Sequence, residues 1–190
     1  MDTSFQSAIA AVRAELCRAP LPDRAGNDAS VVPGLYLSWD DTARVEIALA
    51  RPEGGLLALD ARIEGRPEWL SLNIAAGEVV LTPGHTLGLI AALAGPAHTR
   101  LPVVLRSGLD GETDDTPWDD GFDRLDWPRT QVLLQRLDTD MPATRPGAFH
   151  TLMIHLPAQS FRLEIRDLAA IVRPTPARGP HLTLAQMAGS

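Results

Sequence analysis

The side chains most able to do chemistry in this chain are concentrated in one acidic segment. Between Asp110 and Asp126 there are eight carboxylates and a single Arg124, a local charge of −7 that equals the formal net charge of the whole protein. Residues 110–127 also hold three of the nine aromatic residues, Trp118, Phe122 and Trp127. Dense charge combined with aromatic rings makes this segment the strongest candidate for a binding site, although no catalytic motif accompanies it.

The first hypothesis for this segment is a saccharide site. Aromatic rings can pack on the C–H faces of a sugar, while carboxylates and a guanidinium hydrogen-bond to its hydroxyl groups. The side chains that would form such a site are Trp118, Asp119, Asp120, Phe122, Asp123, Arg124 and Trp127.

A calcium site is a second hypothesis, because carboxylate oxygens are the ligands that Ca²⁺ prefers. The candidate ligands are Asp110, Glu112, Asp114 and Asp115. Their spacing does not follow the EF-hand loop, whose glycine and closing glutamate positions do not match here. Because the ligand chemistry fits but the spacing does not match that motif, calcium is an alternative cofactor and not the first hypothesis.

The third hypothesis is a solvated loop whose aromatic rings pack against the end of the domain. Like charges at this density repel one another, so an ordered segment needs cationic partners. We expect Arg106, Arg124 or Arg129 to supply them.

The sequence favours a non-catalytic protein over an enzyme. Pairs such as Asp119 with Asp123, or Asp114 with Asp120, could stand at the separations that glycosidases use. With eight carboxylates available some pair always fits, so this spacing carries little information. There is no Gly-x-Ser-x-Gly elbow, no glycine-rich phosphate loop and no His-x-His pair, and the single Cys17 cannot form an intrachain disulfide.

The composition excludes some classes of partner. The sequence pI is about 5.1 and no basic patch is present, which argues against a nucleic-acid partner. No run approaches the roughly 18 apolar residues of a membrane helix. Asp2 stands where a signal peptide would be basic, so we expect a cytoplasmic protein without membrane contact.

The N-terminal residues 1–20 are predicted to form an amphipathic helix that Thr3 or Ser4 caps and that the Pro20–Pro22 pair ends. Its apolar residues recur at the spacing of one helical face and are Phe5, Ile9, Val12 and Leu16. A helix this short is not stable alone and must bury its stripe. We expect it to dock on its own domain, and the alternative is a homo-oligomer through this helix.

Two-residue alternation replaces the helical period after a linker at 21–34. The predicted strands are 44–49, 57–63, 69–75, 86–93, 102–106, 130–137, 149–156 and 161–165, the last extended by 168–173. Eight or nine short strands without intervening helices predict an all-β antiparallel jelly-roll β-sandwich over 35–173. A Pro-rich tail, 174–190, ends in apolar residues that could dock on the body or on a partner.

One predicted strand offers a second candidate surface. Trp69, Ser71 and Asn73 share one face of strand 69–75. An aromatic ring beside short polar groups could line a shallow ligand groove, but packing beneath the N-terminal helix is the favoured interpretation.

The closing segment, Ser160 to Leu168, resembles the terminal strand of galactose-binding-like jelly rolls, the architecture of many carbohydrate-binding modules. The resemblance implies glycan binding and transfers no individual binding residue. We therefore predict a non-catalytic carbohydrate-binding-like module, accessory to polysaccharide or glycoconjugate metabolism. The alternatives are a protein-interaction module that assembles through the helix, and a glycoside hydrolase that uses paired Asp in the acidic segment.

Overall fold

Two antiparallel six-stranded sheets form a sandwich in the computed structural model, which describes residues 4–175. Sheet A has the order β1-β4-β5-β12-β7-β10, with β1 (Arg24–Ala25), β4 (Arg44–Ala50), β5 (Leu57–Glu64), β12 (Phe161–Pro174), β7 (His85–Ala94) and β10 (Arg129–Arg136). Sheet B has the order β2-β3-β6-β11-β8-β9, with β2 (Ser30–Val32), β3 (Leu35–Trp39), β6 (Leu70–Glu78), β11 (Phe149–His155), β8 (Leu101–Leu109) and β9 (Glu112–Phe122). The predicted all-β sandwich of jelly-roll type is confirmed.

The structure has more strands than were predicted, because β3 was not among the predicted strands and because two regions expected to be irregular are extended. The linker 21–34 contributes the edge strands β1 and β2, and the acidic segment forms β9 instead of a loop. Trp118 and Phe122 lie on the inward face of β9 and pack in the core. The many carboxylates around them made this strand resemble a solvated loop in the sequence.

Strand β12 runs without a break through the predicted strand 161–165 and its predicted extension 168–173. Phe161, Leu163 and Ile165 face the core, and the inward positions then change to Leu168 and Ala170. A register shift between Ile165 and Asp167 against β7 accommodates this change of phase. The β-bulge lets one strand present both apolar sets to the same side.

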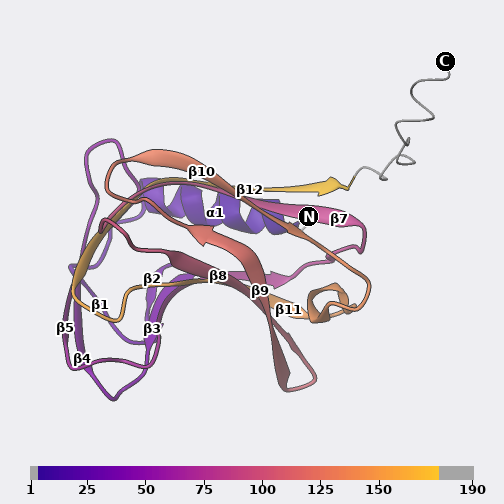
Figure 1. Cartoon of the computed structure of the whole chain (residues 1–190), viewed down its shortest axis with the longest axis horizontal. Helices are drawn as coiled ribbons and strands as arrows, with labels where there is room; N and C mark the ends of the chain where they lie inside the picture. The colour runs from indigo at the N-terminus through magenta and orange to yellow at the C-terminus, as the bar shows by residue number, and fades with distance from the viewer. Residues whose placement is uncertain (1–3, 176–190) are drawn as a thin grey trace, which may run out of the picture.

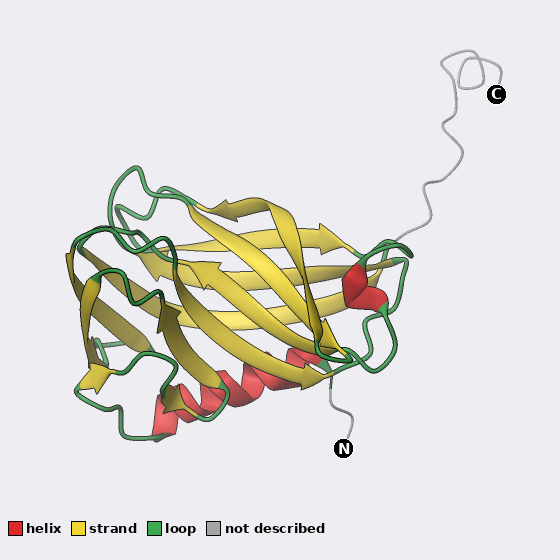
Figure 2. Ribbon diagram, turned by 90° about the horizontal axis from the view of Figure 1, so that it is seen from below, coloured by secondary structure: helices red, strands yellow, loops and turns green. Residues whose placement is uncertain are grey.

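Helix α1 (Phe5–Arg18) bridges the two sheets along one side of the sandwich (Figure 1; Figure 2). It contacts β12 of sheet A and both β6 and β2 of sheet B. Its four stripe residues, Phe5, Ile9, Val12 and Leu16, are between 0% and 2% exposed. The predicted docking on the chain's own domain is confirmed, so assembly through this stripe would require the helix to leave the body.

Polar contacts fix both ends of the helix. The Ser7 backbone N–H donates to Ser4 Oγ at the N-cap, at 3.2 Å. At the other end, Arg51 Nη2 donates to the carbonyl oxygens of Leu16 and Ala19, at 2.6 and 2.7 Å. These bonds satisfy backbone groups that a helix end leaves free.

No helix within residues 4–175 has the length and apolar character that crossing a membrane requires. A short 3₁₀ helix, η1 (Pro142–Thr144), precedes β11. The predicted docking of the tail residues Leu182, Leu184 and Met187 concerns positions outside the described range.

Candidate functional site

A groove of about 550 Å³ lies on the outer face of sheet B. Its walls and floor come from the central strands β3, β6, β11 and β8, whose alternate side chains point away from the core. The lining residues are Asp28, Tyr36, Ser38, Trp69, Ser71, Asn73, Arg106, Thr151, Met153 and His155.

Strand register arranges these side chains in rows across the sheet. Residues directly opposite one another on antiparallel strands have Cβ atoms about 4.5–5.5 Å apart. The rows are Ser38–Ser71–His155, Tyr36–Asn73–Met153 and Thr151–Arg106–Asp115. The side chains on the floor of the groove therefore form regular rows, and most of them are polar and uncharged.

The polar floor is buried more deeply than its composition suggests. Ser71 is 1% exposed and Asn73 is 2% exposed. Ser71 Oγ finds no hydrogen-bond partner among residues 4–175, and Asn73 Nδ2 donates to the Ser71 carbonyl oxygen at a long 3.5 Å. Burying a polar group without a partner costs about 1–3 kcal/mol. A ligand hydroxyl that reached Ser71 Oγ, after the side chains that cover it moved aside, would recover that energy.

Two aromatic side chains rise above this floor. Tyr36 is half-buried on β3, and Trp69, immediately before β6, is 40% exposed. The Asp40 carboxylate fixes the turn before β6, because it accepts from the backbone N–H groups of Trp69 and Glu68. Hydrogen bonding from the Thr42 side chain, then from backbone N–H groups, holds the pKa of Asp40 below its ordinary value.

The Thr151 row, at one end of the groove, carries an ion pair two rows away from His155. Arg106 donates from Nε and Nη2 to the two carboxylate oxygens of Asp115, at 2.7 and 2.8 Å. These bonds lower the pKa of Asp115 and raise that of Arg106. Burial lowers the pKa of His155, and the nearby Asp115 charge only partly opposes this. His155 is therefore a neutral donor and acceptor at pH 7.

The acidic segment does not form the predicted aromatic surface. Trp118 is 6% exposed and Phe122 is fully buried, since both point into the core from β9. Their rings cannot stack on a ligand at the surface, and this part of the prediction needs correction. Trp127 is 60% exposed, and a ligand contact by Trp127, Asp119, Asp120, Asp123 and Arg124 stays a prediction.

Arginines pair with four of the eight carboxylates of this segment. Three ion pairs are close, namely Asp115–Arg106 at 2.7 Å, Asp123–Arg129 at 2.9 Å and Asp114–Arg145 at 2.8 Å. The expected partnerships of Arg106 and Arg129 are confirmed. Asp120 lies 3.9 Å from Arg100, an arginine that the sequence did not single out.

The predicted calcium ligands Asp110, Glu112, Asp114 and Asp115 are not gathered around one point. Asp114 and Asp115 are consecutive on β9 and face opposite sides of the strand, each toward its own arginine. Within residues 4–175 no three His, Cys, Asp or Glu side chains come together as a metal site. A cation held by these four residues would need β9 to rearrange.

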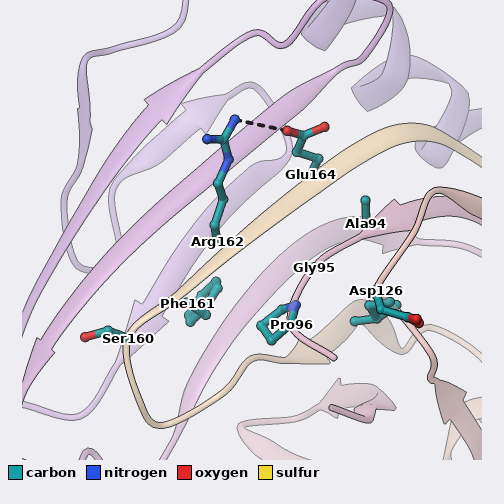
Figure 3. A pocket seen from close by; sticks show the side chains of 9 residues that line it. Ala94, Gly95, Pro96, Asp126, Ser160, Phe161, Arg162 and Glu164 are labelled. Carbon is teal, nitrogen blue, oxygen red and sulfur yellow. Dashed lines mark hydrogen bonds and ion pairs between the residues drawn. The ribbon is translucent and has the colours of Figure 1, made fainter. Parts of the chain in front are cut away.

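A second, shallower hollow of about 480 Å³ lies where the acidic segment meets β12 (Figure 3). Its lining residues are Ala94, Gly95, Pro96, Leu125, Asp126, Ser160, Phe161, Arg162 and Glu164. Arg162 Nη2 pairs with Glu164 at 3.1 Å, so these two charges are already matched. This hollow therefore has fewer free polar groups than the groove.

Sequence reasoning identified only part of the groove. The Trp69, Ser71, Asn73 face lines it, so the favoured interpretation, packing beneath the helix, is wrong. Tyr36 and Ser38 carried the same alternating signal on β3 but were not selected. The remaining groove residues lie on strands that neighbour β6 only in space, and no spacing in the sequence reveals that.

Comparisons with known proteins show the fold alone. No family model matches the chain, and no curated protein matches it in sequence. A Stig cyclase from Fischerella sp. TAU, in complex with (3Z)-3-(1-methyl-2-pyrrolidinylidene)-3H-indole, is similar in structure with a TM-score of 0.53 and 13% identity. The match covers 85% of this chain and 95% of the cyclase chain.

Carbohydrate-binding modules are also among the similar structures. A CBM4 module matches with a TM-score of 0.49 and 16% identity over 74% of this chain and 96% of its own. The CBM22-1 xylan-binding domain of Paenibacillus barcinonensis Xyn10C matches with a TM-score of 0.43 and 12% identity, over 84% and 99% of the two chains.

Proposed function

We propose that this protein is a carbohydrate-binding module that holds a saccharide in the groove of sheet B. The observation that carries the proposal is the buried polar floor around Ser71 beneath two aromatic side chains, Tyr36 and Trp69. Aromatic faces take the C–H side of a sugar ring, and hydroxyl and amide groups take its polar edge. The groove volume also falls within the usual range of about 300–1,000 Å³ for ligand sites.

The groove offers hydrogen-bonding groups of both kinds to a sugar. The Ser71 and Thr151 hydroxyls can donate or accept, and neutral His155 does both. Asn73 presents an amide, and Ser38, whose proton goes to Asp28, can accept. Such a set suits hydroxyl groups, each of which donates one bond and accepts others. A binding role of this kind is accessory to polysaccharide or glycoconjugate metabolism.

A matched pair of tryptophan variants tests the position of the site. Calorimetric titration with a panel of gluco-, xylo-, manno- and chito-oligosaccharides identifies a binding sugar, and the variants are then compared on it. Trp69→Ala should weaken binding about tenfold or more, which is about 1.4 kcal/mol, because the stacking surface is lost. Trp127→Ala, which removes an exposed ring near the second hollow, should leave affinity unchanged.

The reverse result would contradict the groove. Affinity that survives Trp69→Ala but falls in Trp127→Ala would place the sugar beside the acidic segment instead. Near-native unfolding temperatures in both variants would exclude misfolding as the cause.

A further inference from the structure

Asp28 is the carboxylate that lines the groove, and it lies in the loop before β2. Hydrogen bonds fix the backbone conformation of this loop. The Asp28 φ of +55° lies in the left-handed region, which Asp adopts more readily than most residues. The Asp28 backbone N–H donates to the Leu37 carbonyl oxygen at 2.9 Å. The Asn27 side chain bonds both the N–H and the C=O of Trp39, each at 2.9 Å. The loop therefore continues the hydrogen-bonding edge of β3 and holds the carboxylate at the rim.

The Asp28 carboxylate is oriented but not neutralised. Its Oδ1 accepts from Ser38 Oγ at 2.5 Å, and no cationic side chain within residues 4–175 forms an ion pair with it. Among residues 4–175 the one cation that lines the groove is Arg106, and it is already matched to Asp115 through two hydrogen bonds. Asp28, on the β3 side, is thus the charged group of the described groove that has no opposite charge paired with it.

Two aromatic side chains flank this charge. Ser38 is directly opposite Ser71, and Tyr36 and Trp69 lie on the two sides of that row along the strands. The electron-rich face of an aromatic ring attracts a cation. A carboxylate placed between Tyr and Trp rings therefore favours a ligand ammonium group more than a hydroxyl.

We infer that the saccharide of this groove carries a protonated amino group, which Asp28 binds between Tyr36 and Trp69. This inference rests on the proposed function and adds the ligand class. An amino group donates to the free carboxylate oxygen, while the remaining hydroxyls of the sugar meet Ser71, Asn73 and Thr151. An N-acetylated sugar lacks the charge and loses this contact.

Two tetrasaccharides that differ only in this group test the inference. A β-1,4-linked glucosamine tetramer and its N-acetylated counterpart are titrated into the full-length protein at about pH 6, where such amines are protonated. The glucosamine tetramer should bind about tenfold more tightly, because a charge-assisted bond and a cation–π contact are added. Asp28→Asn keeps an acceptor for Ser38 and a residue that tolerates positive φ, yet it should reduce the preference to within about twofold.

A control is needed because β9 would also attract a cation. Asp120→Asn removes the same charge from the acidic segment, where Asp120 is 80% exposed, and should leave the preference intact. A preference that persists in Asp28→Asn, or that disappears in Asp120→Asn, overturns the inference. Failure of the glucosamine tetramer to bind also overturns it. Equal binding of both tetramers that Trp69→Ala abolishes overturns the amino-sugar class while leaving saccharide binding in the groove supported.

Discussion

His150 and His155 lie on the same strand, β11, and face opposite sides of sheet B. His155 lines the groove, whereas His150 is 1% exposed inside the sandwich, with Nδ1 3.0 Å from Ser107 Oγ. Burial lowers the pKa of His150, and the Val79 backbone only partly offsets it. The interior therefore favours a neutral imidazole at this position.

Acid should destabilise the fold through His150. Its pKa in the folded state is below the ordinary value of 6.5, so the unfolded chain binds the proton more readily. The contribution of His150 to stability is present above pH 6.5 and is lost as pH falls below that value, by at most about 1.4 kcal/mol per pH unit. His150→Gln should flatten the pH dependence of the free energy of unfolding between about pH 7 and 5.

Urea unfolding at a series of pH values measures this slope. His98→Gln, at an exposed loop position, is the matched control and should keep the wild-type slope. Identical slopes in His150→Gln and the wild type would show that this imidazole does not couple protonation to folding.

The opposite orientations of the two histidines follow from their odd spacing on one strand, which the sequence does predict. The inward orientation of Trp118 and Phe122 was harder to predict from the sequence. Both share a face with Thr116, but Pro117 and Gly121 interrupt the pattern, and the surrounding carboxylates suggest a solvated loop. Residue type alone could not separate a core aromatic from a stacking one.

At the level of elements, the position of β9 gives a structural reason for the five carboxylates that it carries. It is the edge strand of sheet B, and exposed strand edges invite pairing with other chains. Charged side chains and proline both discourage such pairing, and Pro117 is tolerated at an edge because one side of the strand needs no ladder bond. The carboxylates of β9 therefore protect an edge as well as binding arginines.

Helix α1 is a structural element of the domain. Its stripe fills the space between β12 and β6, and Arg13 Nε contacts Asp167 at 2.6 Å on the β12 bulge. Both charges of that pair are about half exposed, so the apolar stripe supplies most of the helix's contribution.

Truncation of the stripe should destabilise the whole domain. Ile9→Ala removes a side chain that is 0% exposed and should lower the free energy of unfolding by about 2–5 kcal/mol. Cys17→Ser, at an exposed position of the same helix, should change it by less than about 0.5 kcal/mol. Chemical denaturation measures both. An Ile9→Ala protein that kept its stability but changed its elution volume would show instead that the stripe joins two copies.

The helix itself was predictable from the sequence, because its period and cap are local. What the stripe packs against was not, since periodicity identifies the buried face of a helix and says nothing of its partner. The strands β1 and β2 were missed for a related reason. They are two and three residues long and exist only because β4 and β3 lie beside them.

Across the whole molecule, topology assembles the groove from distant positions. Strands β3, β6, β11 and β8 are neighbours in sheet B, although Asp28 and His155 are far apart in the sequence. The alternation that predicts each strand does not predict the order of strands. The fold class could therefore be predicted from the sequence, while the site required the strand pairing.

Mapping a bound saccharide by NMR tests the groove most directly. Amide chemical shifts are followed while a binding oligosaccharide is added to the labelled full-length protein. We predict that the shifts concentrate on the groove strands, at Ser71, Asn73, Thr151 and the Trp69 indole. Shifts confined to the second hollow and the acidic segment, at Gly95, Asp126 and Trp127, would contradict a binding site on the outer face of sheet B.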